Sequence, residues 1–363
     1  MRNWLGINLG LLLLLLSCDA SEKPINEEQS ENALNAVNVE NAWWISSSEI
    51  QGTTQGTTFV VKTSEDSLFT TPEEISRFLA EFDQELSGYI DTSLLSQLNS
   101  AVDTFVMPSE KFFTKCYDLS QAVFTATNGA FDPSVFPLVK QWGFFKDITQ
   151  PPSKEAIDSI LAFVGFEKGK LHDFSNATFI KKDPRFMLDF NAIAQGQSVD
   201  ELAELLDKKG QKNYFIEVGG ELKVKGVNPD GKPWIIGIDL PSEENDGKSA
   251  RNLENYLSLS SGAIATSGNY RKFYEKDGKK YSHTLDPSTG FPVEHQLLSA
   301  TVYAESAAIA DAYATAFMVM GVEKTMNFVR ANPQLQIHVY LLFENQNGRI
   351  ERAYSEGMQQ FLL

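Results

Sequence analysis

Three short motifs follow one another between residues 265 and 315, and this stretch constrains the chain more than any other. It reads A-T-S-G-N-Y at 265–270, H-T-L-D-P-S-T-G at 283–290 and D-A-Y-A-T at 311–315. Small residues allow the backbone to approach a ligand closely. His283 adds the side chain whose ordinary pKa lies nearest to neutrality, which makes it a natural proton carrier. The stretch therefore predicts a ligand site with acid–base chemistry.

Each motif also has a purely structural interpretation, which the residues alone leave open. A histidine near a turn is commonly a hydrogen-bonded structural residue, and an aspartate near a helix start commonly caps that helix. The pattern D-P-x-T-G by itself is typical of a turn. The functional interpretation is favoured because the motifs lie close together and in this order.

The third motif also indicates a metal. Asp311 and Thr315 are four residues apart in a helical pattern, so both side-chain oxygens face the same side of the helix. Hard oxygen ligands suit Mg²⁺ better than zinc. The spacing therefore predicts a magnesium site on this helix.

The first 18 residues have the pattern of a secretory signal. Arg2 provides a positive start, residues 9–16 are mostly leucine, and L-L-S-C at 15–18 forms the processing site. The apolar run is too short to span a bilayer as a mature helix. The L-L-S-C sequence resembles a bacterial lipobox, which predicts that Cys18 becomes the lipidated first residue. An ordinary signal peptide with an incidental cysteine is the alternative.

The composition separates a tether from a folded domain. Residues 19–41 are rich in Glu, Asn and Ser and poor in large apolar side chains, which is typical of a flexible tether. Residues 42–363 form the predicted domain. The whole chain has 363 residues and 42% hydrophobic content, enough for the core of one large or two modest domains.

The net charge of −17 excludes two classes of partner. An acidic chain repels nucleic acid and anionic lipid, so we expect neither as a ligand. Membrane attachment would then depend on the lipid at Cys18. The other cysteine, Cys116, lies on an apolar helical face, so we expect a buried thiol and no disulfide framework.

Local patterns predict interleaved helices and short strands. Thr71-Pro72 begins a helix with an N-cap and a proline in the first turn. Ser198–Glu201 has the pattern of a capping box, followed by a helix that ends at Lys209-Gly210. Further helices are predicted at 94–99, 109–126, 153–163 and 311–329. Strands are predicted at 55–61, 213–218, 221–225, 234–239, 256–260, 280–285, 297–303 and 335–343.

Read in order, residues 43–345 resemble the ApbE family, flavin transferases that are often bacterial lipoproteins. The resemblance is carried by A-T-S-G and H-x-x-D-P-x-T-G followed by A-D-A-x-x-T, together with the segments at 130–133, 189–200 and 219–220. It implies an α+β fold with mixed, mainly antiparallel sheets flanked by helices. An FAD cleft would lie between two subdomains.

The resemblance also implies an activity and its setting. The enzyme would be an FAD:protein FMN transferase that uses Mg²⁺, transfers FMN from FAD to a Thr or Ser hydroxyl of a target protein and releases AMP. Its acceptors would be flavoprotein subunits of membrane redox complexes. The protein would be lipid-anchored in the bacterial cell envelope and would face the periplasm.

Matching the family's motifs residue by residue assigns the site. The metal falls on the side chains of Asp311 and Thr315 and on the backbone carbonyl of Ala192. His283 matches the acid–base histidine; from the chemistry of the residues, we expect Asp286 or another carboxylate to orient it. The FAD-binding positions are Gly56, Thr57, Tyr89, Ala130, Phe131, Asp132, Asp189, Gln195 and Thr284.

Two departures from the family pattern bear on ligand affinity. Gln55 stands where the family often has Met, and Gln195 stands where it often has Lys, so a positive charge near the dinucleotide is missing. An FAD-binding lipoprotein or an FAD pyrophosphatase without a protein acceptor is therefore the main alternative. A solute-binding lipoprotein, which would share only the envelope location, is a third hypothesis.

Overall fold

An antiparallel sheet of nine strands organises the part of the chain that the computed structural model describes. Its strands are β1 (Ala42–Ser46), β2 (Glu49–Thr54), β3 (Thr57–Lys62), β7 (Tyr214–Val218), β8 (Glu221–Lys225), β11 (Ser261–Gly268), β14 (Leu297–Ala304), β15 (His338–Glu344) and β16 (Ile350–Tyr354), in this spatial order. The described residues are 42–108, 110–143, 151–167, 169–241, 252–269, 273–276, 279–282 and 284–363.

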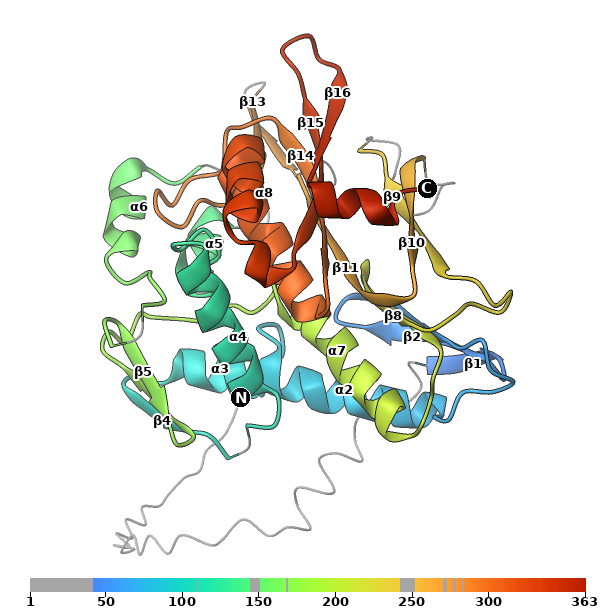
Figure 1. The fold of residues 1–363 in the computed structure, drawn as a ribbon. Coiled ribbons are helices and arrows are strands. Elements are labelled where there is room, and N and C mark those ends of the chain that lie inside the picture. The colour runs from blue at the N-terminus through green and yellow to red at the C-terminus, as the bar shows by residue number, and fades with distance from the viewer. Residues whose placement is uncertain are drawn as a thin grey trace, which may run out of the picture. The chain divides into compact units, whose positions relative to one another are not determined.

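Smaller sheets and helices surround this sheet (Figure 1). The smaller sheets pair β9 (Trp234–Asp239) with β10 (Leu253–Leu259), β12 (Phe273–Lys276) with β13 (Lys279–Ser282), and β6 (Thr178–Lys181) with both β4 (Thr104–Val106) and β5 (His172–Ser175). The α-helices are α2 (Pro72–Leu86), α3 (Leu94–Ser100), α4 (Phe113–Ala126), α5 (Phe136–Trp142), α6 (Lys154–Leu161), α7 (Ala194–Lys208) and α8 (Ala307–Ala331). Two 3₁₀ helices are η1 (Pro333–Leu335) and η2 (Glu356–Phe361).

Successive side chains of the central strands point to opposite faces of the sheet, which divides the core into layers. In β11, Ala263 and Ala265 pack against helices, while Ile264 between them joins a cluster with Trp234 of β9 and Met358 of η2. This follows from the two-residue period of a strand, which sends neighbouring side chains to opposite faces. Helices thus cover one face of the sheet, and β9, β10 and η2 cover the other.

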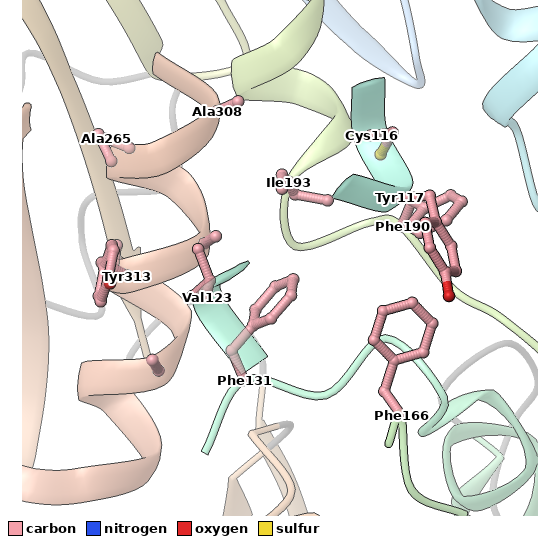
Figure 2. Close-up of a cluster of buried hydrophobic side chains, with 14 of the residues drawn as sticks. Cys116, Tyr117, Val123, Phe131, Phe166, Phe190, Ile193, Ala265, Ala308 and Tyr313 are labelled. Carbon is pink, nitrogen blue, oxygen red and sulfur yellow. The ribbon is translucent and has the colours of Figure 1, made fainter. Parts of the chain in front are cut away.

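The largest core cluster lies on the helical face. Figure 2 shows Cys116, Tyr117 and Val123 of α4 in one cluster with Phe131 and Tyr313. These side chains are almost completely buried, which stabilises the position of α8 against α4 through the hydrophobic effect. The free thiol of Cys116 is buried, as its place on an apolar face predicted.

Most sequence predictions of elements agree with the structure. The predicted α+β fold with mainly antiparallel sheets is confirmed. Helix α2 begins at Pro72, and the Thr71 side chain accepts a hydrogen bond from the backbone N–H of Glu74 as its N-cap. Among the described residues, no helix has both the length and the apolar character that crossing a bilayer requires.

The predicted capping box at 198–201 is wrong. Helix α7 begins at Ala194, so Ser198 lies inside the helix and its hydroxyl donates to the backbone carbonyl of Gln195 at 2.7 Å. The N-cap residue, Ile193, makes no side-chain capping bond. The backbone N–H of Gly196 instead donates to the carboxylate of Asp311. A contact distant in sequence therefore replaces the local cap.

Candidate active site

A cavity of about 1650 Å³ opens where the β2–β3 turn, the end of α2 and the first turns of α8 meet the loops around residues 130 and 190. Most small-molecule sites enclose roughly 300–1,000 Å³, so this cavity has room for a large ligand. Strands β7, β9 and β11 contribute to its wall.

The described part of the cavity wall is acidic. Among the described residues, its only basic side chain is Lys62, and its carboxylates are Asp83, Asp132, Asp189, Glu217, Glu221, Asp239 and Asp311. Burial raises the pKa of Asp83, of Asp132 and of Asp189 to about 6 in each case, because a charged carboxylate is poorly solvated there. An anionic ligand would need cations to enter such a site.

The three positions assigned to the metal line the same cavity. These are Ala192, two residues before α7, and Asp311 and Thr315 on α8. The Oδ2 atom of Asp311 accepts a hydrogen bond from Gly196 N at 3.2 Å, and the hydroxyl of Thr315 lies 3.3 Å from that of Ser267. Burial raises the pKa of Asp311 above its ordinary range, and the Gly196 N–H opposes this rise.

These residues suit Mg²⁺ by their chemistry. A carboxylate, a hydroxyl and a carbonyl are hard oxygen donors, and Mg²⁺ usually completes its six positions with water and substrate phosphates. In the described ranges, no three or more His, Cys, Asp or Glu side chains cluster closely enough to hold a metal by themselves. A metal here would therefore depend on the backbone, a hydroxyl and the substrate as well as on Asp311.

Two of the predicted FAD contacts are linked through a residue that the sequence analysis did not select. Asn191 donates from its side chain to the Tyr89 hydroxyl at 3.2 Å and from its backbone to Asp189 Oδ1 at 2.8 Å. Tyr89 is 66% exposed and lies on the cavity wall. Partial desolvation, and then the charge of Asp189, raise the pKa of Tyr89. Asn191 thus holds an exposed ring beside a half-buried carboxylate.

Asp132 and Thr284 are also fixed by neighbours. One oxygen of Asp132 accepts hydrogen bonds from the backbone and the hydroxyl of Ser134, at 2.7 and 2.6 Å. The hydroxyl of Thr284 donates to Asn269 Oδ1 at 2.7 Å. Both Asp132 and Thr284 line the cavity, so two loops far apart in sequence present polar groups to it.

The structure does not bring every predicted residue to the cavity. Gly56, Ala130, Phe131 and Gln195 line it, whereas Thr57 does not.

Asp286 is likewise not among the lining residues, although Thr284, Leu285 and Pro287 are. Its Oδ1 accepts from the backbone and the hydroxyl of Ser288, at 2.8 and 2.6 Å. Its described contacts are those of a turn, and its catalytic role stays a prediction. His283 and Cys18 lie outside the described residues.

Comparison with known proteins identifies the family of this chain. The sequence model of the ApbE family matches residues 54–340, a range that includes the whole set of described cavity residues from Gln55 to Val319. The chain belongs to the ApbE family.

Two relatives and one solved structure also support the assignment to this family. An FAD:protein FMN transferase of Haemophilus influenzae is 34% identical over 316 residues, covering 84% of this chain and 89% of the relative. One of Vibrio cholerae is 35% identical over 377 residues, covering 100% and 99%. The solved flavin transferase ApbE from Vibrio cholerae superimposes with a TM-score of 0.75 at 32% identity, covering 86% of this chain and 98% of that one.

The two departures from the ApbE pattern both lie on the cavity wall. The amide of Gln195 packs closely on Gly219, since a Cβ built at Gly219 would lie 2.8 Å from Gln195 Nε2. Gln55 contacts Asp83 and, with Thr54, opposes the rise in its pKa. Neutral amides therefore occupy both positions in a cavity that is otherwise acidic.

Ser267, Asn191 and Asp83 are lining residues that sequence reasoning missed, for two different reasons. Ser267 and Asn191 stood inside quoted motifs, so their neighbours could have indicated them. Asp83 carried no signal, because on the amphipathic helix α2 it resembles any solvent-facing carboxylate. Only the packing of α2 beside the β2–β3 turn shows that it faces the cavity.

Proposed function

We propose that this protein transfers FMN from FAD to the hydroxyl group of a Thr or Ser residue in a target protein, with Mg²⁺ as the metal and AMP as the second product. Transfer from FAD to protein is the activity named for its relatives in the same family. One observation supports the metal in this proposal: Ala192, Asp311 and Thr315 all line the same large cavity, whose described wall is acidic.

The acidic wall is the physical reason for a divalent cation. The diphosphate of FAD is anionic, and carboxylates such as Asp189 and Glu217 would repel it. Mg²⁺, when bound, neutralises diphosphate oxygens and the charge that develops on the leaving phosphate. The carboxylate of Asp311, the hydroxyl of Thr315 and the carbonyl of Ala192 would hold it.

The proposed reaction is a substitution at phosphorus. The target hydroxyl oxygen forms a bond to the FMN phosphorus, the bond from that phosphorus to the bridging oxygen breaks, and AMP leaves. We propose His283 as the base that takes the hydroxyl proton, a role generally worth about 10²–10⁴-fold in rate. The next residue, Thr284, lines the cavity, so the chain reaches the site at this point.

An FAD pyrophosphatase that passes FMN to water is the alternative. Gln195 favours it, because the family often has a lysine there and its charge would help to hold the dinucleotide. The test is incubation of the purified protein with FAD, Mg²⁺ and a threonine-containing acceptor domain, followed by mass spectrometry. We expect an acceptor heavier by one FMN, and no addition to an acceptor whose threonine is replaced by valine. Free FMN beside an unmodified acceptor would instead establish the pyrophosphatase.

We also propose that Cys18 is lipidated and anchors the protein in the bacterial cell envelope, facing the periplasm. Its acceptors would then be flavoprotein subunits of membrane redox complexes. The proposal is supported by the apolar run at 9–16 and by L-L-S-C at 15–18. Metabolic labelling with a palmitate analogue should mark the wild-type protein and not Cys18→Ala. Equal labelling of the two would contradict the anchor.

A further inference from the structure

Helices α7 and α8 cap each other with carboxylates. The backbone N–H of Gly196, in the first turn of α7, donates to Asp311 of α8 at 3.2 Å. The backbone N–H of Ala308, in the first turn of α8, donates to Asp200 of α7 at 3.0 Å. Each carboxylate therefore lies at the positive end of the other helix, where it satisfies an unpaired N–H group.

The two helix ends approach closely. Figure 1 shows the orange end of α8 beside the yellow-green end of α7, and Figure 2 shows Ala308 near the loop that carries Ile193. A Cβ atom at Gly196 would collide with the carbonyl oxygen of Ala307. Glycine is thus required at this position for the reciprocal capping to form.

Asp200 is held by three donors. Its Oδ2 accepts from the hydroxyl of Ser306 at 2.6 Å as well as from Ala308 N, and its Oδ1 accepts from Lys223 Nζ at 2.7 Å. Lys223 also donates to the carbonyl of Glu305 at 2.9 Å, just before α8. The Asp200 side chain is only 8% exposed. It is absent from the cavity wall, so it can act on the site only through the placement of α7 and α8.

The proposed metal ligands are divided between these two helices. Ala192 stands two residues before α7, whereas Asp311 and Thr315 belong to α8. We propose that Asp200, supported by Ser306 and Lys223, is a positioning residue for the Mg²⁺ site. Its hydrogen bonds set where α8 begins relative to α7, and so set the spacing of the three oxygens. The inference rests on the proposed function.

The chain offers a matched control. Asp207, further along α7, pairs with Lys225 of β8 at 2.8 Å. It repeats the helix-to-strand ion pair of Asp200 but makes no hydrogen bond to the described residues of α8. The experiment titrates Mn²⁺ into the purified full chain, with and without FAD, by electron paramagnetic resonance. We expect Asp200→Asn to weaken Mn²⁺ binding about 10–100-fold, as loss of residues that orient metal ligands does elsewhere. Asp207→Asn should leave the affinity unchanged.

Further variants separate positioning from general stability. Ser306→Ala should weaken Mn²⁺ binding, and Ser306→Thr, which keeps the hydroxyl, should restore it. If Asp200→Asn does not fold, as judged by circular dichroism, Lys223→Gln replaces it in the comparison with Lys225→Gln. Wild-type Mn²⁺ affinity in the folded variants would overturn this inference and leave the proposed metal site standing. Equal losses of Mn²⁺ affinity in the Asp207 and Lys225 controls would do the same. Undiminished Mn²⁺ binding in Asp311→Asn would overturn the proposed metal site and this inference with it.

Discussion

At the scale of single residues, Asp311 combines burial with a place on the cavity wall. One of its oxygens accepts a hydrogen bond from Gly196 N, and burial disfavours its charged form. A buried carboxylate is costly unless it is paired or binds a metal. The proposed function accounts for this cost, because the Asp311 carboxylate would hold Mg²⁺.

Replacement of Asp311 tests that explanation. Asp311→Asn should abolish Mg²⁺-dependent transfer, because an amide oxygen is a much weaker ligand for a hard cation. The free energy of unfolding should change by less than about 1–2 kcal/mol, since the amide can still accept from Gly196 and no charge is buried. Gel fluorescence of the flavinylated acceptor and urea denaturation measure the two effects. A variant that transfers FMN at the wild-type rate would contradict the metal assignment.

Asp83 should make stability depend on pH. Burial raises its pKa from 3.8 to about 6, so the folded chain binds this proton more tightly than the unfolded chain does. The contribution of Asp83 to stability is therefore greatest at low pH and is lost as the pH rises through about 4 to 6.

Asp83→Asn removes that dependence. The variant should be more stable than the wild type at pH 7, by on the order of 1–3 kcal/mol, and the difference should shrink towards pH 4. Urea denaturation between pH 4 and pH 7, followed by tryptophan fluorescence, measures the difference in stability between the variant and the wild type. Glu81→Gln, on the exposed side of α2, is the control. A difference in stability that does not vary with pH would contradict the raised pKa of Asp83.

At the scale of elements, the junction of α7 and α8 combines a helix start with a site wall. Alanine is generally about 1 kcal/mol more favourable than glycine inside a helix. At Gly196 the order should be reversed, because a Cβ atom would overlap the Ala307 carbonyl. The cost of such crowding is usually about 1–3 kcal/mol.

Gly196→Ala should therefore lower the free energy of unfolding by about 1–3 kcal/mol, as measured in urea. Gly88→Ala is the control, because a Cβ atom there meets nothing within 4 Å. The Gly196 variant should also bind Mn²⁺ more weakly, since it separates α8 from the segment that carries Ala192. A more stable Gly196 variant would mean that the helix ends do not touch as described.

At the scale of the whole molecule, charge opposes the proposed substrate. The chain carries −17 and its cavity wall is acidic, whereas FAD carries an anionic diphosphate. Salt screens the repulsion between the chain and an approaching FAD molecule, because the Debye length falls from about 30 Å at 0.01 M to about 10 Å at 0.1 M. The same negative charge should attract Mg²⁺.

Without Mg²⁺, the association rate of FAD should therefore rise several-fold, on the order of 3-fold, between low and moderate salt. Stopped-flow flavin fluorescence measures this rate. Riboflavin, which lacks the phosphates, serves as the control and should show little dependence on salt. An FAD association rate that falls as salt is added would contradict the acidic character of the site.

Local patterns in the sequence were sufficient for much of this fold. The N-cap at Thr71, the helical spacing of Asp311 and Thr315 and the order of the motifs depend on residues close together in the chain. The motifs also predicted residues that the structure does bring to one cavity, from Gly56 to Thr315. Helix periods and caps are encoded by neighbours, so they can be predicted without knowledge of packing.

Only the tertiary structure decided where α7 begins, which carboxylates face the cavity and which do not. Ser198 had the sequence of a cap, yet the backbone N–H of Gly196 in the first turn of α7 donates to Asp311, which lies 115 residues further along the chain than Gly196. Asp286 had the sequence of a catalytic partner and bonds within its own turn, while Asp83 had no signal and lines the site. A polar side chain forms hydrogen bonds with whichever groups the packed helices and strands bring near it. These groups often come from segments distant in the chain, so the neighbouring residues do not predict them.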